Sequence, residues 1–204
     1  MNRPRLLMIL ALVALALFGG MLAWRLADRG QGGGASTGAA LVGGPFQLID
    51  QDGKAADQTL LEGKWSAVFF GYTYCPDVCP LTLSALGAAQ KEMGRRGRDL
   101  QTVFITVDPA RDTPAQLKSY LSAPVFPRPV TGLTGTPEQI AAAAKVYRAP
   151  YSREGEGAGY LMNHPAMLYL MDPNGRFNRI IPDGLPPAEV ARQITEAMRE
   201  GPQT

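Results

Sequence analysis

The sequence predicts an α/β fold with a mixed central sheet flanked by helices, preceded by a single transmembrane helix. Two observations favour the sheet: continuous apolar runs typical of buried strands alternate with helical patterns, and the last two predicted strands form a hairpin. The third is an uncharged apolar stretch near the N-terminus. A length of 204 residues, with 46% hydrophobic and 19% charged residues, suits one domain plus an anchor.

The apolar stretch Leu6–Trp24 contains 19 residues without a charge and has arginines on both sides. As a helix it would rise about 28 Å, close to the thickness of the bilayer hydrocarbon. A cleaved signal peptide is the alternative, since Ala14-Leu15-Ala16 resembles a cleavage site, but the apolar run continues beyond it. We therefore expect residues 1–29 to form a tail and an uncleaved anchor.

The short tail before this span favours an N-in orientation, which exports the main domain. The expected location is a bacterial inner membrane, with the C-terminal domain in the periplasm, where cysteines can cycle between thiol and disulfide. Residues 30–44 hold seven glycines and no charge, so they read as a flexible linker. The folded domain is expected over residues 45–204.

The charge balance argues against nucleic-acid binding. The net charge is +2 overall, from 20 basic and 18 acidic residues. Without the four arginines and one aspartate that flank the apolar stretch, it becomes −1. The one dense basic cluster left is Arg95, Arg96 and Arg98. Nucleic-acid binding normally needs a longer basic stripe, so we expect no nucleic-acid partner.

The first elements of the domain follow from turn residues and apolar runs. Phe46–Asp50 and the segment from Lys54 flank Gln51-Asp52-Gly53, which predicts an N-terminal hairpin extension. Residues 64–72 and 101–107 are continuous apolar runs that predict buried strands. Between them, residues 81–96 show the apolar spacing of a helix.

The second half of the domain continues the alternation. Thr113-Pro114 and Thr136-Pro137 open helices that should reach about Leu121 and Val146, because proline is favoured in a first turn. Short strands are expected at residues 130–133 and 148–153, with a turn over residues 154–159. Residues 166–171 and 176–181 predict strands joined by a turn, and Pro186-Pro187 should introduce a last helix that reaches about Glu200.

The segment that carries both cysteines lies between a predicted buried strand and a predicted helix. It reads Gly71-Tyr72-Thr73-Tyr74-Cys75-Pro76-Asp77-Val78-Cys79-Pro80. Unpaired N–H groups at a helix N-terminus favour thiolates, so we expect both cysteines to have a lowered pKa. The i, i+4 spacing would place Cys75 and Cys79 on one helix face, near enough for a disulfide or a shared metal ion.

The single histidine, His164, precedes a predicted strand in a loop that can reach the cysteine segment, because loops at strand ends gather at one edge of such a sheet. Two thiolates and an imidazole suit copper or zinc, whereas a structural zinc site normally needs four ligands. Pro165 follows the histidine, and its peptide bond is a candidate for the cis form.

Three segments together resemble the Sco/SenC family of copper-binding, thioredoxin-fold proteins that assist cytochrome c oxidase assembly. They are Phe69–Pro80 (FFGYTYCPDVCP), Val107–Pro114 (VDPARDTP) and His164–Phe177 (HPAMLYLMDPNGRF). The resemblance covers roughly residues 45–200. It implies a thioredoxin-like fold and one copper ion per chain, as Cu(I), Cu(II) or both, with Cys75, Cys79 and His164 as ligands.

The resemblance also implies a role in building the CuA centre of oxidase subunit II, by copper delivery, by reduction of its cysteines, or by both. A periplasmic copper donor and a thiol reductant are the further partners implied. The chain departs from the family where Asn163-His164-Pro165 replaces the common Asp-His-Ser. The missing carboxylate removes one acceptor that would orient the imidazole.

Asp108 and Asp112 match the acidic pair of the family, and the resemblance implies that they support the copper ligands from behind or contact a partner. Their alternative roles are structural: Asp112 as the N-cap of the next helix and Asp108 as a brace for a turn. Met162, Met167 and Met171 are expected in packing rather than as ligands.

Two other functions remain open. The first is a membrane-tethered thiol–disulfide oxidoreductase without obligatory copper, in which Cys75 attacks a disulfide and Cys79 resolves the mixed disulfide. The second is an interaction domain in which both cysteines are incidental.

Overall fold

The computed structural model describes residues 42–202. The expected membrane span and most of the expected linker lie outside these residues. Within residues 42–202, no helix is both long and apolar enough to cross a membrane.

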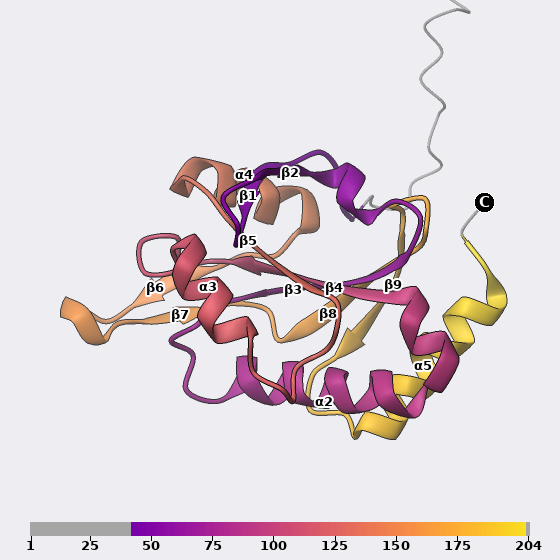
Figure 1. The fold of residues 1–204 in the computed structure, drawn as a ribbon. Coiled ribbons are helices and arrows are strands. Elements are labelled where there is room, and N and C mark those ends of the chain that lie inside the picture. The colour runs from indigo at the N-terminus through magenta and orange to yellow at the C-terminus, as the bar shows by residue number, and fades with distance from the viewer. Residues whose placement is uncertain (1–41, 203–204) are drawn as a thin grey trace, which may run out of the picture. The chain divides into compact units, whose positions relative to one another are not determined.

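The domain is built on a seven-stranded mixed sheet (Figure 1). β3 pairs in parallel with β4, and β4 pairs in parallel with β5, whereas every other neighbouring pair is antiparallel. The mixed sheet predicted from the sequence is therefore confirmed. In spatial order the strands are β2 (Ala55–Asp57), β1 (Gln47–Asp50), β5 (Val130–Thr134), β4 (Leu100–Thr106), β3 (Trp65–Gly71), β8 (Met167–Met171) and β9 (Phe177–Pro182).

The two central strands form where the sequence is apolar on both faces. Every residue of β3 is buried, and β4 is buried except for the half-buried Gln101. The strands run in register from Trp65 opposite Leu100 to Gly71 opposite Thr106, so their carboxyl ends lie together. The segments that leave these two ends carry the cysteines and the acidic pair.

Helices cover both faces of the sheet (Figure 1). α2 (Val78–Glu92), α3 (Pro114–Leu121) and α5 (Pro187–Glu200) lie on one face, and α4 (Pro137–Tyr147) lies on the other. Thr113 caps α3 by accepting a hydrogen bond from the Gln116 amide, and Thr136 forms a capping box with Gln139 at α4. Both starts match the threonine–proline pairs of the sequence.

Three short 3-10 helices and a small hairpin complete the domain. The 3-10 helices are η2 (Gln58–Leu61), η3 (Gly94–Asp99) and η4 (Gly157–Gly159). The hairpin pairs β6 (Ser152–Glu154) with β7 (Leu161–Asn163) and forms a sheet separate from the central one. The sequence predicts an extended segment at residues 148–153 and places His164 in a loop. It gives no sign of β7, because exposed strands carry no apolar alternation.

The only cis peptide bond within residues 42–202 joins Arg128 and Pro129. The expectation of a cis bond before Pro165 is therefore wrong.

Candidate metal centre

The cysteine segment turns sharply between β3 and α2. The Cys75 amide donates to the Tyr72 carbonyl at 3.2 Å, and α2 begins only at Val78. Cys75 therefore precedes the helix, and the expectation that both sulfurs share one helix face is wrong. The Cys75 Sγ instead accepts a hydrogen bond of 3.5 Å from the Cys79 amide in the first helical turn. This contact brings the two sulfurs together by a cap-like arrangement.

His164 completes a group of three ligand-type side chains. Its Nε2 lies 3.5 Å from the Cys79 Sγ, and one ligand atom from each of Cys75, Cys79 and His164 lies within 4.8 Å of the others. These distances suit a single ion that all three side chains contact after small shifts. Two soft sulfurs and one imidazole nitrogen match the preferences of copper, so the donor set fits that metal.

The histidine ring is held from several sides. Nδ1 lies 3.2 Å from the Pro165 carbonyl oxygen, which can only accept, so Nδ1 carries the proton and the Nε2 lone pair faces the sulfurs. The rings of Phe69 and Tyr72 pack edge-on against the imidazole, with centroids at 6.0 and 5.8 Å. In this chain a backbone carbonyl thus serves as the acceptor that orients the ring.

The two thiols differ in their acidity. Hydrogen bonds from the Cys79 thiol and from the Cys79 and Asp77 amides lower the pKa of Cys75 to about 4. The same thiol–thiol contact and complete burial raise the pKa of Cys79. The expectation of a lowered pKa therefore holds for Cys75 and is wrong for Cys79, because the buried sulfur is the hydrogen-bond donor of the pair.

The position of Cys79 depends on the absence of a side chain at Gly71. A Cβ at that position would lie 2.8 Å from the Cys79 Sγ, 3.0 Å from Phe104 and 3.1 Å from Phe69. Such distances are shorter than van der Waals contact. Gly71, at the end of β3, therefore provides the space in which the sulfur sits.

Asp112 fastens the cysteine segment to the end of β4. Its buried carboxylate accepts hydrogen bonds from the Thr73 amide at 3.0 Å and from the hydroxyls of Thr73 and Thr106 at 2.6 Å each. The N-cap of α3 is Thr113, so the N-cap alternative for Asp112 is wrong. Asp112 thus holds Thr73, which lies two residues before Cys75.

Asp108 contacts a different part of the site. It forms an ion pair with Arg111 and accepts a hydrogen bond of 2.6 Å from the Tyr160 hydroxyl. The residue is 3% exposed, and its backbone amide donates to the Thr106 hydroxyl at 2.9 Å. Neither Asp108 nor Asp112 belongs to the group of three ligand-type side chains found within residues 42–202.

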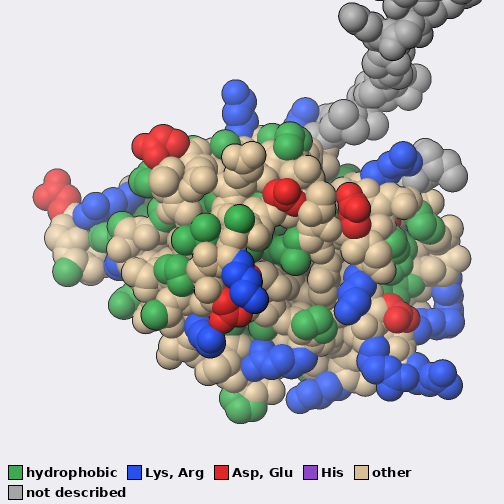
Figure 2. Space-filling model, turned by 45° about the horizontal axis from the view of Figure 1, so that its top comes forward, with side chains coloured by type: hydrophobic (Ala, Val, Ile, Leu, Met, Phe, Trp, Pro, Cys, Tyr) green, Lys and Arg blue, Asp and Glu red, His purple; other side chains and the backbone are tan. Residues whose placement is uncertain are grey.

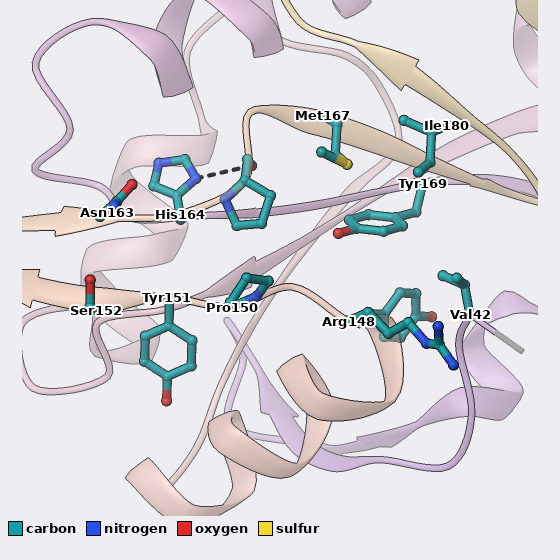
Figure 3. Close-up of a pocket in the computed structure, with 12 residues that line it drawn as sticks. Val42, Arg148, Pro150, Tyr151, Ser152, Asn163, His164, Met167, Tyr169 and Ile180 are labelled. Carbon is teal, nitrogen blue, oxygen red and sulfur yellow. Dashed lines mark hydrogen bonds between the residues drawn. The ribbon is translucent and has the colours of Figure 1, made fainter. Parts of the chain in front are cut away.

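A cavity of about 670 Å³ opens beside the histidine (Figure 3). Asn163 and His164 lie at one end of it, and Val42 and Ile180 lie at the other. Met167 and Tyr169 of β8 form one wall, so the space next to the imidazole is largely apolar. The cavity reaches the imidazole, but neither Cys75 nor Cys79 lines it.

A model of the SCO1/SenC family matches residues 34–199. The chain belongs to the SCO1/SenC family. SenC of Rhodobacter capsulatus is 45% identical over 141 residues, which are 69% of this chain and 63% of that protein. SCO1 homolog 1 of Arabidopsis thaliana, a mitochondrial protein, is 44% identical over 146 residues, 71% of this chain and 43% of that one. The chain therefore spans less than two thirds of either relative.

A solved structure shares the fold of this SCO1/SenC domain. ScoI of Bradyrhizobium japonicum, determined with copper bound, aligns with a TM-score of 0.69 and 42% identity, covering 76% of this chain and 99% of that one. The family resemblance read from the sequence is confirmed, as is the α/β fold of thioredoxin type.

Sequence reasoning missed several residues that shape this SCO1/SenC site. Tyr72 and Phe69 pack on the imidazole, Gly71 leaves room for a sulfur, and Arg111 and Tyr160 join Asp108. Gly71 and Tyr72 lie inside the cysteine motif, so their closeness in sequence to the cysteines was a signal that they belong to the site. No local pattern indicated Tyr160, because its partner is 52 residues away.

Proposed function

We propose that this chain is a membrane-anchored copper-binding protein that assists assembly of the CuA centre of cytochrome c oxidase. Residues 1–29 would supply the tail and anchor, residues 30–44 the linker, and residues 45–204 the copper-binding domain in the periplasm. Cys75, Cys79 and His164 would hold one copper ion. The observation that carries the proposal is the grouping of these three side chains within 4.8 Å, although His164 is 85 residues from Cys79.

The choice of copper as the bound metal rests on the chemistry of the ligands. The donor set is soft, the chain offers no fourth Cys or His for a closed zinc site, and a 42% identical relative has been determined with copper bound. The copper ion is the cargo. The chain's own part is to hold Cys79 at the buried end of the site, with Cys75 and His164 partly exposed.

Release of the ion would proceed by ligand exchange. A partner thiolate approaches the partly exposed Cys75, forms a bond to the metal, and displaces one ligand of this chain at a time. The cysteines of oxidase subunit II are the proposed acceptors, and a periplasmic copper donor and a thiol reductant are proposed to prepare the site.

A second function is favoured by the different acidities of the two thiols. Both cysteines are free, Cys75 is the more acidic and the more exposed, and Cys79 stays protonated and buried. The Cys75 thiolate would attack a disulfide of subunit II and release one thiolate. Cys79, after losing its proton to that thiolate, would attack Cys75 and release the other. The partner gains two electrons, and this chain forms the Cys75–Cys79 disulfide.

Metal analysis of the purified, reduced protein tests the leading proposal. We expect one copper per chain in the wild type and much weaker Cu(I) binding in His164→Ala, measured against a chromophoric Cu(I) competitor. Equal and tight binding by both proteins would remove His164 from the site. Disulfide reduction without copper, unaffected by His164→Ala, would instead support the oxidoreductase.

A further inference from the structure

The hairpin that leads to His164 lies outside the central sheet. β6 and β7 pair only with each other, and β7 ends at Asn163, immediately before the histidine. An isolated two-stranded hairpin is marginally stable in water, so its position must come from contacts with the rest of the domain. The distance from the imidazole to the sulfurs therefore depends on what anchors this hairpin.

Tyr160 supplies such an anchor. It stands next to β7 and four residues before His164, and its hydroxyl donates to the Asp108 carboxylate at 2.6 Å. Arg111 places its guanidinium carbon 3.6 Å from the centre of the Tyr160 ring and donates to the Tyr160 carbonyl at 3.1 Å. Side chain and backbone of Tyr160 are thus both held by the loop between β4 and α3.

The anchoring loop is itself rigidly placed. Asp108 is 3% exposed, and its ion pair with Arg111 neutralises the carboxylate in this buried position. The same loop carries Asp112, which binds Thr73 of the cysteine segment. One short loop therefore touches both halves of the metal centre, the cysteine segment through Asp112 and the histidine hairpin through Asp108.

From this arrangement we propose that Tyr160 is a positioning residue for His164. Through its contacts with Asp108 and Arg111 it fixes the hairpin, and the hairpin fixes the imidazole next to Cys79. This inference rests on the proposed function, because it assumes that His164 is a ligand. Tyr160 itself does not contact the metal.

The test compares Cu(I) affinity among purified variants, with a chromophoric competitor as the probe. Tyr160→Leu removes the ring and the hydroxyl, and we expect about tenfold weaker binding, typical of losing a hydrogen bond to a charged group. Tyr160→Phe keeps the ring beneath the Arg111 guanidinium and should recover part of the loss. Leu161→Ala changes a neighbouring side chain that is 46% exposed, and should bind copper like the wild type.

A second background separates positioning from general destabilisation. In His164→Ala, the added change Tyr160→Leu should have no further effect on Cu(I) affinity, because the ligand that Tyr160 positions is already gone. An equal loss in both backgrounds would overturn the proposal. Wild-type Cu(I) binding by His164→Ala would instead refute the proposed ligand set.

Hydrogen exchange of the metal-free protein gives a readout that needs no copper. Tyr160→Leu should raise amide exchange in residues 152–163, whereas Leu161→Ala should not. Faster exchange with unchanged Cu(I) affinity would overturn the inference, as would unchanged exchange. If Tyr160→Leu does not fold, Asp108→Asn replaces it, since it keeps the shape of the side chain and weakens the same anchor.

Discussion

Replacement of Gly71 by alanine tests how closely the metal centre depends on the space at the end of β3. The added Cβ would lie 2.8 Å from the Cys79 Sγ, whereas ordinary van der Waals contact begins at about 3.4 Å. The sulfur must therefore move by roughly 0.6 Å, and Phe69 and Phe104 close off the neighbouring space at 3.1 and 3.0 Å. Overpacking of a filled core costs about 1–3 kcal/mol.

The same displacement should act on metal binding. Metal sites tolerate ligand shifts of only about 0.5 Å, and disturbing the support of a ligand typically costs 10- to 100-fold in affinity. We therefore expect Gly71→Ala to fold, to lose about 1–3 kcal/mol in the free energy of unfolding, and to bind Cu(I) at least about tenfold more weakly. Denaturant unfolding and competitor titration measure the two effects separately.

Gly132→Ala provides the matched control. Gly132 is also a buried strand glycine, and its added Cβ would meet the Leu121 side chain at 2.5 Å and Leu117 at 3.3 Å, both on α3 and outside the metal centre. It should lower stability without changing Cu(I) affinity. The reasoning fails if a folded Gly71→Ala binds Cu(I) like the wild type, or if both variants lose affinity equally.

Three further predictions follow from the site and the helices. In metal-free protein, the rate of Cys75 alkylation by iodoacetamide should fall as the pH drops through about 4, because the thiolate is the nucleophile. Cys79→Ala should move this midpoint to a higher pH, because it removes the thiol that donates to Cys75. A wild-type midpoint near pH 8.5 would contradict the assigned hydrogen bond. Asp112→Ala leaves the Thr73 amide and two hydroxyls without their acceptor, and it should lower the free energy of unfolding by about 2–4 kcal/mol. A loss below about 0.5 kcal/mol would show that water replaces the carboxylate. Thr136→Ala removes the capping box of α4 and should lower stability by about 1 kcal/mol without affecting Cu(I) binding, which thermal unfolding and the competitor titration check together.

Local sequence signals located most elements because each rests on neighbouring residues. The apolar runs of β3 and β4 and the threonine–proline starts of α3 and α4 need no distant partner to be recognised. The β6–β7 hairpin was missed in part because both strands are mostly exposed, so burial leaves no pattern in their residue order.

The candidate site likewise has features that the sequence predicts and features that it does not. The two cysteines and the only histidine are conspicuous by residue type, and the order of three motifs is enough to indicate the SCO1/SenC family. The different acidities of the thiols were not predictable, because they depend on which sulfur is buried and which one donates.

The sequence by itself determined the order of the helices and of the strands of the central sheet, the chemistry of the donor set and the family, since these are encoded in residue types and short spacings. Only the tertiary structure decided that the imidazole lies beside Cys79, that Gly71 leaves room for its sulfur, and that Asp108 and Asp112 serve two different segments. The physical reason is that each of these contacts joins residues that only folding brings together, so their distances depend on packing across the sheet edge rather than on local preference.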